Sequence, residues 1–202
     1  MASLIDKLSG LYNRDYFMQQ LRTEVARCRR YGRPLTLLLL EIQYDFFEYG
    51  LDLKWTMGYS LFKQLGPVIK ETYRNVDLAA RYSGEIFAVS LPETPLEGAA
   101  IAGERLRKRV EEHEFLGTAE KERVRIALNI GVATFPDHGQ TIDELLETAR
   151  AGMELARDRG GNIVIVGRAD PLQSSARPPA ASEGSQESEE ASGAAAEGTS
   201  PD

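Results

Sequence analysis

The chain has 202 residues, of which 42% are hydrophobic and 8% aromatic, which suits one globular core with an appendage. Its net charge of −7 gives no sign of a surface for nucleic acid or a membrane. The single cysteine, Cys28, excludes an intrachain disulfide and suits a reducing compartment. The N-terminus lacks a signal-peptide pattern, and the longest apolar run, Leu35 to Leu40, is too short to span a bilayer. We therefore expect a soluble, cytoplasmic protein.

Residues 168–202 differ in composition from the rest of the chain. They hold seven of the 31 acidic and two of the 24 basic residues, which leaves 24 acidic and 22 basic residues, or a charge of −2, elsewhere. Leu172 is the only large apolar side chain in this segment, so burial cannot offset the entropy of ordering it. The sequence predicts a domain over residues 1–167 and a disordered acidic tail over 168–202, most simply a solubilising one.

The first half of the chain alternates helical and strand patterns. Apolar residues at helical spacing predict a helix over Asp15–Arg30, which Gly32 should end. The apolar run Leu35–Ile42 is typical of a central buried strand. A second helical pattern covers Trp55–Tyr73, and Pro67 within it should kink the helix or end it early.

The second half of the chain carries patterns for four further strands and two further helices. The expected strands are Val76–Tyr82, Ile86–Leu91, Val124–Thr134 and Ile163–Val166, and the expected helices are Pro95–Glu112 and Ile142–Asp158. The first two strands should form a hairpin, because they are separated by a short turn that contains a glycine. The order of elements predicts an α+β fold in which helices flank a central, mainly antiparallel sheet.

Four motifs in this order resemble the diguanylate cyclase, or GGDEF, family. The hairpin turn Ser83-Gly84-Glu85-Ile86-Phe87 is similar to the Gly-Gly-Asp/Glu-Glu-Phe signature of that family, with two positions changed. The other motifs are Asp6–Arg14, Ile130–Pro136 and Leu155–Asn162, which resemble the opening, the last long strand and the closing motif. The resemblance implies a GGDEF, nucleotidyl-cyclase-like fold.

The resemblance also implies a metal-dependent active site. Enzymes of the family join two GTP molecules into cyclic di-GMP, using divalent metals that carboxylates hold against the phosphates. The positions that would bind the metal fall on Glu41, the carbonyl of Ile42, and Glu85. We therefore expect that these residues could bind Mg²⁺, although the protein requires no cofactor. The alternative is that these are solvated acids at the ends of strands.

Several positions of the implied active site are altered, and we therefore expect no turnover. Gln43 and Ile86 replace acids, Ser83 replaces a glycine that lets the backbone approach phosphate, and Arg157 replaces the phosphate-binding lysine. The loop over residues 46–54 has no Asn to recognise guanine, and Asp52 is the only remnant of that pair. Glu85 would then be a catalytic remnant in a protein that is not an enzyme.

Beside the altered turn, the product-binding inhibitory motif of the family is complete. Arg74 and Asp77 lie five residues before the signature, where the resemblance implies a cyclic di-GMP site, and Arg81 adds positive charge nearby. A guanidinium fork suits recognition of a guanine edge or a phosphate. The alternative is an ordinary surface ion pair that contributes little.

The resemblance thus indicates a catalytically inactive regulatory domain that acts as a cyclic di-GMP receptor. The first alternative is a protein-interaction module without a ligand, using the aromatic-rich segment Tyr44–Trp55 or the tail. Our preferred interpretation of the aromatic segment itself is that it fills the vacated pocket. The second alternative is a weakly active diguanylate cyclase. The expected partners are cyclic di-GMP and an unidentified protein, and a homodimer is an open alternative. We expect the protein to bind neither nucleic acid nor a membrane.

Overall fold

The computed structural model describes residues 3–43, 53–117 and 123–167, and only the backbone of residues 53–59. These residues belong to one compact unit, Met1–Ala169. The predicted tail, Asp52 and most of the aromatic segment lie outside the described residues. None of the described helices is long and apolar enough to cross a bilayer.

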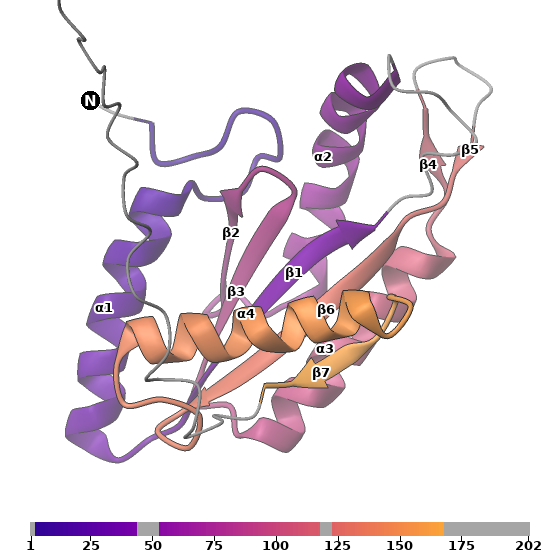
Figure 1. Ribbon diagram of the computed structural model, residues 1–202. Coiled ribbons are helices and arrows are strands. Elements are labelled where there is room, and N and C mark those ends of the chain that lie inside the picture. The colour runs from indigo at the N-terminus through magenta and orange to yellow at the C-terminus, as the bar shows by residue number, and fades with distance from the viewer. Residues whose placement is uncertain (1–2, 44–52, 118–122, 168–202) are drawn as a thin grey trace, which may run out of the picture. The chain divides into compact units, whose positions relative to one another are not determined.

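A five-stranded sheet forms the centre of the domain (Figure 1). Its strands are, from edge to edge, β2 (Leu78–Ser83), β3 (Ile86–Pro92), β1 (Leu35–Gln43), β6 (Ala127–Phe135) and β7 (Val164–Val166). All neighbours are antiparallel except β6 and β7, which run parallel. The predicted mainly antiparallel sheet is therefore confirmed.

Four helices cover the two faces of this sheet (Figure 1). Helices α1 (Arg14–Tyr31) and α4 (Ile142–Asp158) cover one face, and α2 (Leu53–Thr72) and α3 (Leu96–Glu112) the other. Strand β1 is buried on both sides because its side chains alternate: Leu37 and Leu39 pack in the first layer, and Leu38 and Leu40 in the second. This confirms an α+β fold with flanking helices.

The helix ends follow the local capping residues. Asn13 accepts a hydrogen bond from the backbone of Tyr16 at the start of α1, and Gly32 ends that helix in the left-handed conformation. Thr141 and Glu144 form a reciprocal capping box at the start of α4. These signals place both helices within one residue of their predicted bounds.

Of the two effects expected of Pro67, a kink or an early end of its helix, the early end is wrong. Helix α2 continues past Pro67 to Thr72, and the residues in between, Val68 and Ile69, are buried in the core. That burial offsets the backbone hydrogen bond that proline cannot donate. The preceding Gly66 lets the helix lie against the backbone of Ser9, where a Cβ would overlap the carbonyl oxygen.

The predicted single strand over residues 124–134 is also wrong in its extent. The chain forms a short strand β5 (Arg123–Val124), leaves it at Arg125 and Ile126, and only then enters β6. Strand β5 pairs with β4 (Phe115–Leu116) in a separate two-stranded sheet. Two-residue strands carry too little periodicity to be recognised from sequence.

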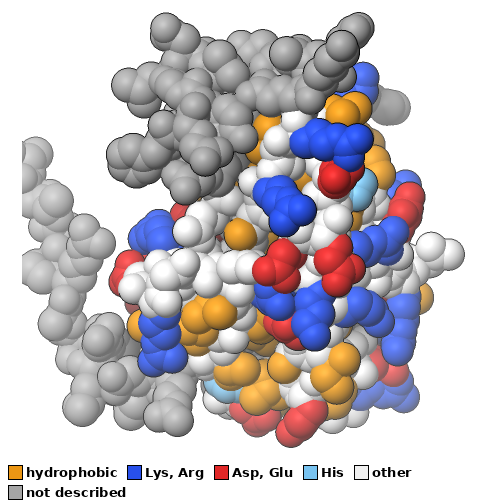
Figure 2. Space-filling model, turned by 90° about the vertical axis from the view of Figure 1, so that its right-hand side faces the viewer, with side chains coloured by type: hydrophobic (Ala, Val, Ile, Leu, Met, Phe, Trp, Pro, Cys, Tyr) orange, Lys and Arg blue, Asp and Glu red, His pale blue; other side chains and the backbone are white. Residues whose placement is uncertain are grey.

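The outer face of α3 carries alternating charges. Arg107 pairs with Glu104 at 2.7 Å and with Glu111 at 2.9 Å. Seen from the side where α3 and β5 lie, acidic and basic side chains are interspersed rather than gathered by sign (Figure 2). The surface drawn there offers no field of a single sign to attract a polyanion.

Candidate functional site

The hairpin between β2 and β3 has the backbone of a tight turn with one glycine in the left-handed region. Gly84 has a φ of 51° and faces open space, and the strand register shifts between Arg81 and Ser83. Ser83 is exposed, whereas Ile86 is half-buried against the core layer under α1. Ile86 therefore serves packing at this end of the sheet and presents no charge.

The end of β1 meets this turn and brings three predicted residues together. The Ile42 N–H donates to the carbonyl oxygen of Glu85 at 3.3 Å. Glu41 lies opposite Ile86 on one side and opposite Asn129 of β6 on the other. Glu41, Ile42 and Glu85 are thus grouped at one end of the sheet.

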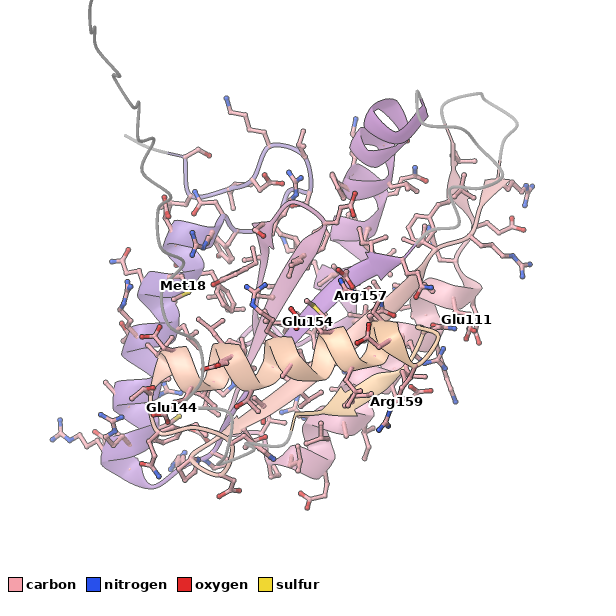
Figure 3. All side chains as sticks on the ribbon, in the orientation of Figure 1. Met18, Glu111, Glu144, Glu154, Arg157 and Arg159 are labelled. Atoms are coloured by element: carbon pink, nitrogen blue, oxygen red, sulfur yellow. The ribbon has the colours of Figure 1, made fainter. Side chains whose placement is uncertain are left out.

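The carboxylate of Glu41 is engaged on both oxygens. Oε1 accepts from Nη1 of Arg157 at 3.0 Å, and Oε2 accepts from Nδ2 of Asn129 at 3.2 Å. Arg157 comes from the last turn of α4, which runs alongside this end of the sheet (Figure 3). Only 18% of the Glu41 side chain is exposed, so its charge is compensated mainly from within the protein.

Next along β1, Gln43 lies against the turn that follows α4. Gly161 has a φ of 80°, and a Cβ at this position would overlap the side-chain amide of Gln43. The left-handed backbone conformation is what favours glycine here, because the exposed end of the Gln43 side chain can move aside. This contact uses Gln43 for packing against the α4–β7 connection.

Arg74 and Asp77 form a compact turn after α2. The Arg74 N–H donates to Oδ2 of Asp77 at 2.8 Å, and the Asp77 N–H donates back to the Arg74 carbonyl at 3.0 Å. Burial raises the pKa of Asp77, while the hydrogen bond from Arg74 and the positive charges of Arg74 and Arg105 act in the opposite direction. The Arg74 side chain is exposed and forms no ion pair with any residue that the structure describes.

Comparison with known proteins decides the ancestry of these motifs. The family model described as "Diguanylate cyclase, GGDEF domain" matches residues 3–163. The chain belongs to the GGDEF domain family.

Curated relatives of this GGDEF domain are bacterial signalling proteins. Response regulator PleD of Caulobacter vibrioides is 33% identical over 168 residues, which cover 81% of this chain and 36% of PleD. Diguanylate cyclase DosC of Escherichia coli is 28% identical over 165 residues, covering 82% of this chain and 35% of DosC. The chain therefore spans about a third of the length of these relatives.

Solved GGDEF domains have the same fold. The GGDEF domain of TpbB from Pseudomonas aeruginosa superposes with a TM-score of 0.74 at 24% identity, covering 82% of this chain and 95% of that one. The GGDEF domain of DgcB from Caulobacter crescentus, solved in complex with c-di-GMP, gives a TM-score of 0.70 at 25% identity, with 83% and 94% covered. The predicted GGDEF fold is confirmed.

The metal that the family implies does not fit the residues of this GGDEF domain as they are arranged. Both oxygens of Glu41 already have partners, one of them the cation Arg157, and Glu85 is the one other acid of the implied ligand set. Among the side chains that the structure describes, no three His, Cys, Asp or Glu residues gather as a metal site would require.

Arg81 lies at the signature turn rather than at the Arg74–Asp77 turn. Its Nε donates to the Gly84 carbonyl at 2.9 Å, its Nη1 lies 3.4 Å from Oδ2 of Asp6, and its guanidinium stacks 4.2 Å from the centre of the Phe62 ring. With 17% of its side chain exposed, Arg81 holds the hairpin turn against the N-terminal motif.

Two residues beside Asp77 were not found from the sequence. Arg105 of α3 donates to the Thr72 carbonyl at 2.8 Å and lies near enough to Asp77 to oppose the rise in its pKa. The hydroxyl of Tyr73 is buried and has no hydrogen-bond partner among the described residues, and burial raises its pKa. Arg105 is far from Asp77 in the sequence, so no local spacing signals that the two are neighbours.

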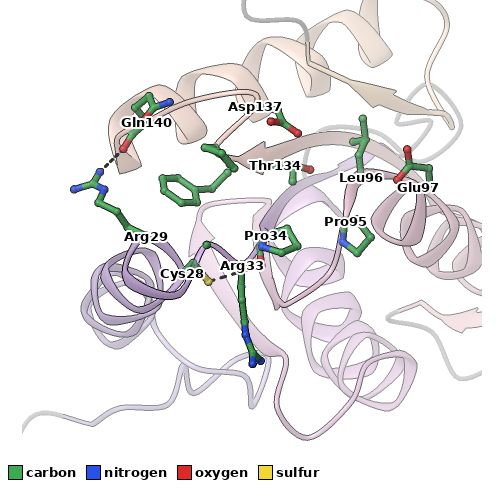
Figure 4. A pocket seen from close by; sticks show the side chains of 13 residues that line it. Cys28, Arg29, Arg33, Pro34, Pro95, Leu96, Glu97, Thr134, Asp137 and Gln140 are labelled. Carbon is green, nitrogen blue, oxygen red and sulfur yellow. Dashed lines mark hydrogen bonds between the residues drawn. The ribbon is translucent and has the colours of Figure 1, made fainter.

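An open pocket of about 520 Å³ lies at the other end of β1, away from the signature turn (Figure 4). Its walls include Cys28, Arg29, Pro34 and Phe135, from the end of α1, the start of β1 and the end of β6. The Cys28 thiol is buried and points at the Pro34 carbonyl, 3.7 Å away, and burial raises its pKa. A thiol in this state is a poor nucleophile.

Proposed function

We propose that this GGDEF domain is a catalytically inactive regulatory module that binds cyclic di-GMP at the Arg74–Asp77 turn. The observation that carries the proposal is the contrast between two sites. Beside the signature turn, the Glu41 carboxylate is paired with Arg157 within the protein, whereas the guanidinium of Arg74 is exposed on a turn whose backbone Asp77 fixes.

The chemistry of the turn matches a ligand with guanine edges and phosphates. An exposed guanidinium presents a planar fork of donors to a phosphate or to the acceptor edge of guanine. The Asp77 carboxylate can accept from guanine N–H groups, and Arg105 adds a second positive charge close by. The DgcB domain, which shares this fold, was solved with c-di-GMP bound.

Two acids that catalysis in the family relies on are missing at the signature turn and at the end of β1. Ile86 packs into the core where the family has an acid, and Gln43 packs on Gly161 instead of acting as a carboxylate. Phosphoryl transfer relies on positioned charge, so the loss of these acids removes the main catalytic contribution. We expect incubation with GTP and Mg²⁺ to give no cyclic di-GMP above a control without protein. Product formation that Glu85→Ala abolishes would identify a weak cyclase instead.

The binding site is tested by calorimetric titration of variants with cyclic di-GMP. Arg74→Ala should weaken binding at least about 30-fold, because breaking a buried charged pair costs roughly 2–5 kcal/mol. Asp77→Ala should act similarly, since both residues contact one ligand. Glu85→Ala at the signature turn should have little effect.

Arg123→Ala is the matched control, because it removes one exposed arginine from β5, outside the proposed site. If Arg74→Ala and Arg123→Ala weaken binding equally, the ligand responds to overall charge and not to this turn. If no variant and no wild-type protein binds, the domain is better explained as a protein-interaction module.

A further inference from the structure

We propose that Arg157 is a built-in cation that takes the place of a divalent metal beside Glu41. The Glu41 side chain is 18% exposed and its charge needs a partner inside the protein. Arg157 supplies that partner at 3.0 Å from Oε1, and the Asn129 amide satisfies Oε2. The carboxylate is thus neutralised and hydrogen-bonded without any metal.

The position of Arg157 is fixed by the turn that follows it. Asn129, which holds Glu41 with its amide nitrogen, accepts the backbone N–H of Asn162 with its oxygen at 3.0 Å. Gly161 of the same turn lies under the side chain of Gln43. Asn129 therefore binds both Glu41 and the connection after α4, and Gln43 contacts the same connection, which places the end of α4 that carries Arg157 beside the carboxylate.

A tethered cation competes with a free one at a large advantage. Arg157 acts at an effective concentration in the millimolar range or above, since it is part of the same chain. A divalent metal would have to displace this guanidinium before it could use Glu41 together with Glu85 and the Ile42 carbonyl, and the apolar Ile86 adds no further oxygen. We therefore predict that the domain does not bind Mg²⁺ or Mn²⁺ at this end of the sheet.

The test is a titration with Mn²⁺, followed by electron paramagnetic resonance of the free ion, on wild type and three variants. Arg157→Ala should expose Glu41 to the metal and gain at least tenfold in affinity over wild type. Arg157→Lys, which keeps a cation, should resemble wild type. The double variant Glu41→Gln with Arg157→Ala should lose whatever the single variant gained.

Arg159→Ala is the matched control, because Arg159 lies two residues further on and projects from the opposite side of α4 (Figure 3). Thermal unfolding gives a second measure: at a Mn²⁺ concentration ten times the dissociation constant, the melting temperature of Arg157→Ala should rise by about 3–6 °C. Wild type and Arg159→Ala should not respond.

The proposal would be overturned if wild type bound Mn²⁺ tightly and lost that binding when Glu41 is replaced. It would also be overturned if Arg157→Ala bound Mn²⁺ no more tightly than wild type, or no more tightly than the double variant that also lacks Glu41. The proposal does not rest on cyclic di-GMP binding. Arg157→Ala should bind cyclic di-GMP as wild type does, so failure of the receptor proposal and failure of this one are separate results.

Discussion

At the scale of single residues, Asp77 sets both the backbone and the charge of the proposed ligand site. It accepts the Arg74 N–H, and burial raises its pKa above the ordinary value of 3.8. When the folded state raises the pKa of an acid, the folded protein binds the proton more tightly than the unfolded chain. The resulting stability is present below the unfolded pKa and is lost as the pH rises through the folded pKa.

Asp77→Asn should remove this pH dependence and keep the turn, because the amide oxygen can still accept the Arg74 N–H. As the pH rises from 3.8 toward neutrality, wild type should lose stability relative to the variant. Asp77→Ala, which has no acceptor, should be less stable than wild type by about 1 kcal/mol. Urea unfolding at a series of pH values measures the stability of all three proteins. If the stability of wild type rose relative to that of Asp77→Asn as the pH increased over this range, the raised pKa would be contradicted.

The sequence located single residues well where a motif carries its own geometry. The resemblance to the inhibitory motif predicted Arg74 and Asp77 in one site, and the structure joins them by two hydrogen bonds. The pairing of Glu41 with Arg157 was not predictable, because the two residues are 116 positions apart. Arg81 was assigned to the ligand site from its spacing alone, and only tertiary structure places it at the hairpin turn.

At the scale of elements, Gly131 in the middle of β6 determines how closely α4 packs. A Cβ at Gly131 would overlap the Ala149 carbonyl oxygen and approach the backbone nitrogen of Met153. Helix and strand are therefore in backbone contact, which explains why the motif Ile130–Pro136 needs glycine at its second position. Periodicity predicted both elements but not this contact, because glycine contributes nothing to a hydrophobic pattern.

Gly131→Ala should destabilise the domain by about 2–4 kcal/mol, because the added methyl group meets backbone atoms that cannot rotate away. Gly103→Ala in α3 is the control: its Cβ would lie 3.3 Å from a Val164 methyl group and 3.4 Å from one of Leu38. Those side chains can adjust, and alanine favours a helix, so the change should stay within about 1 kcal/mol. Denaturant unfolding compares the two, and equal effects would show that α4 can move away from β6.

At the scale of the whole molecule, charge and apolar content are unevenly divided along the chain. The 1–167 segment carries the whole described core, whereas 168–202 carries seven of the 31 acids and almost no large apolar side chains. Composition alone was enough to predict this division, and the order of the helical and strand patterns predicted the α+β class. It could not show the break between β5 and β6, because two-residue strands depend on partners elsewhere in the chain.

Deletion of residues 168–202 should leave the melting temperature within about 2 °C of the full chain, because little apolar burial would be lost. Calorimetry of the full chain and of the 1–167 fragment at equal ionic strength measures the difference. A fall of many degrees would show that the tail contributes to the stability of the domain.

The central claim is that this GGDEF domain senses cyclic di-GMP without making it, and calorimetric titration of the wild-type protein with cyclic di-GMP tests it most directly. Our account predicts saturable binding in the low-micromolar range or tighter, about −8 kcal/mol, together with a rise in melting temperature. The absence of both heat and a melting shift at saturating ligand would contradict it.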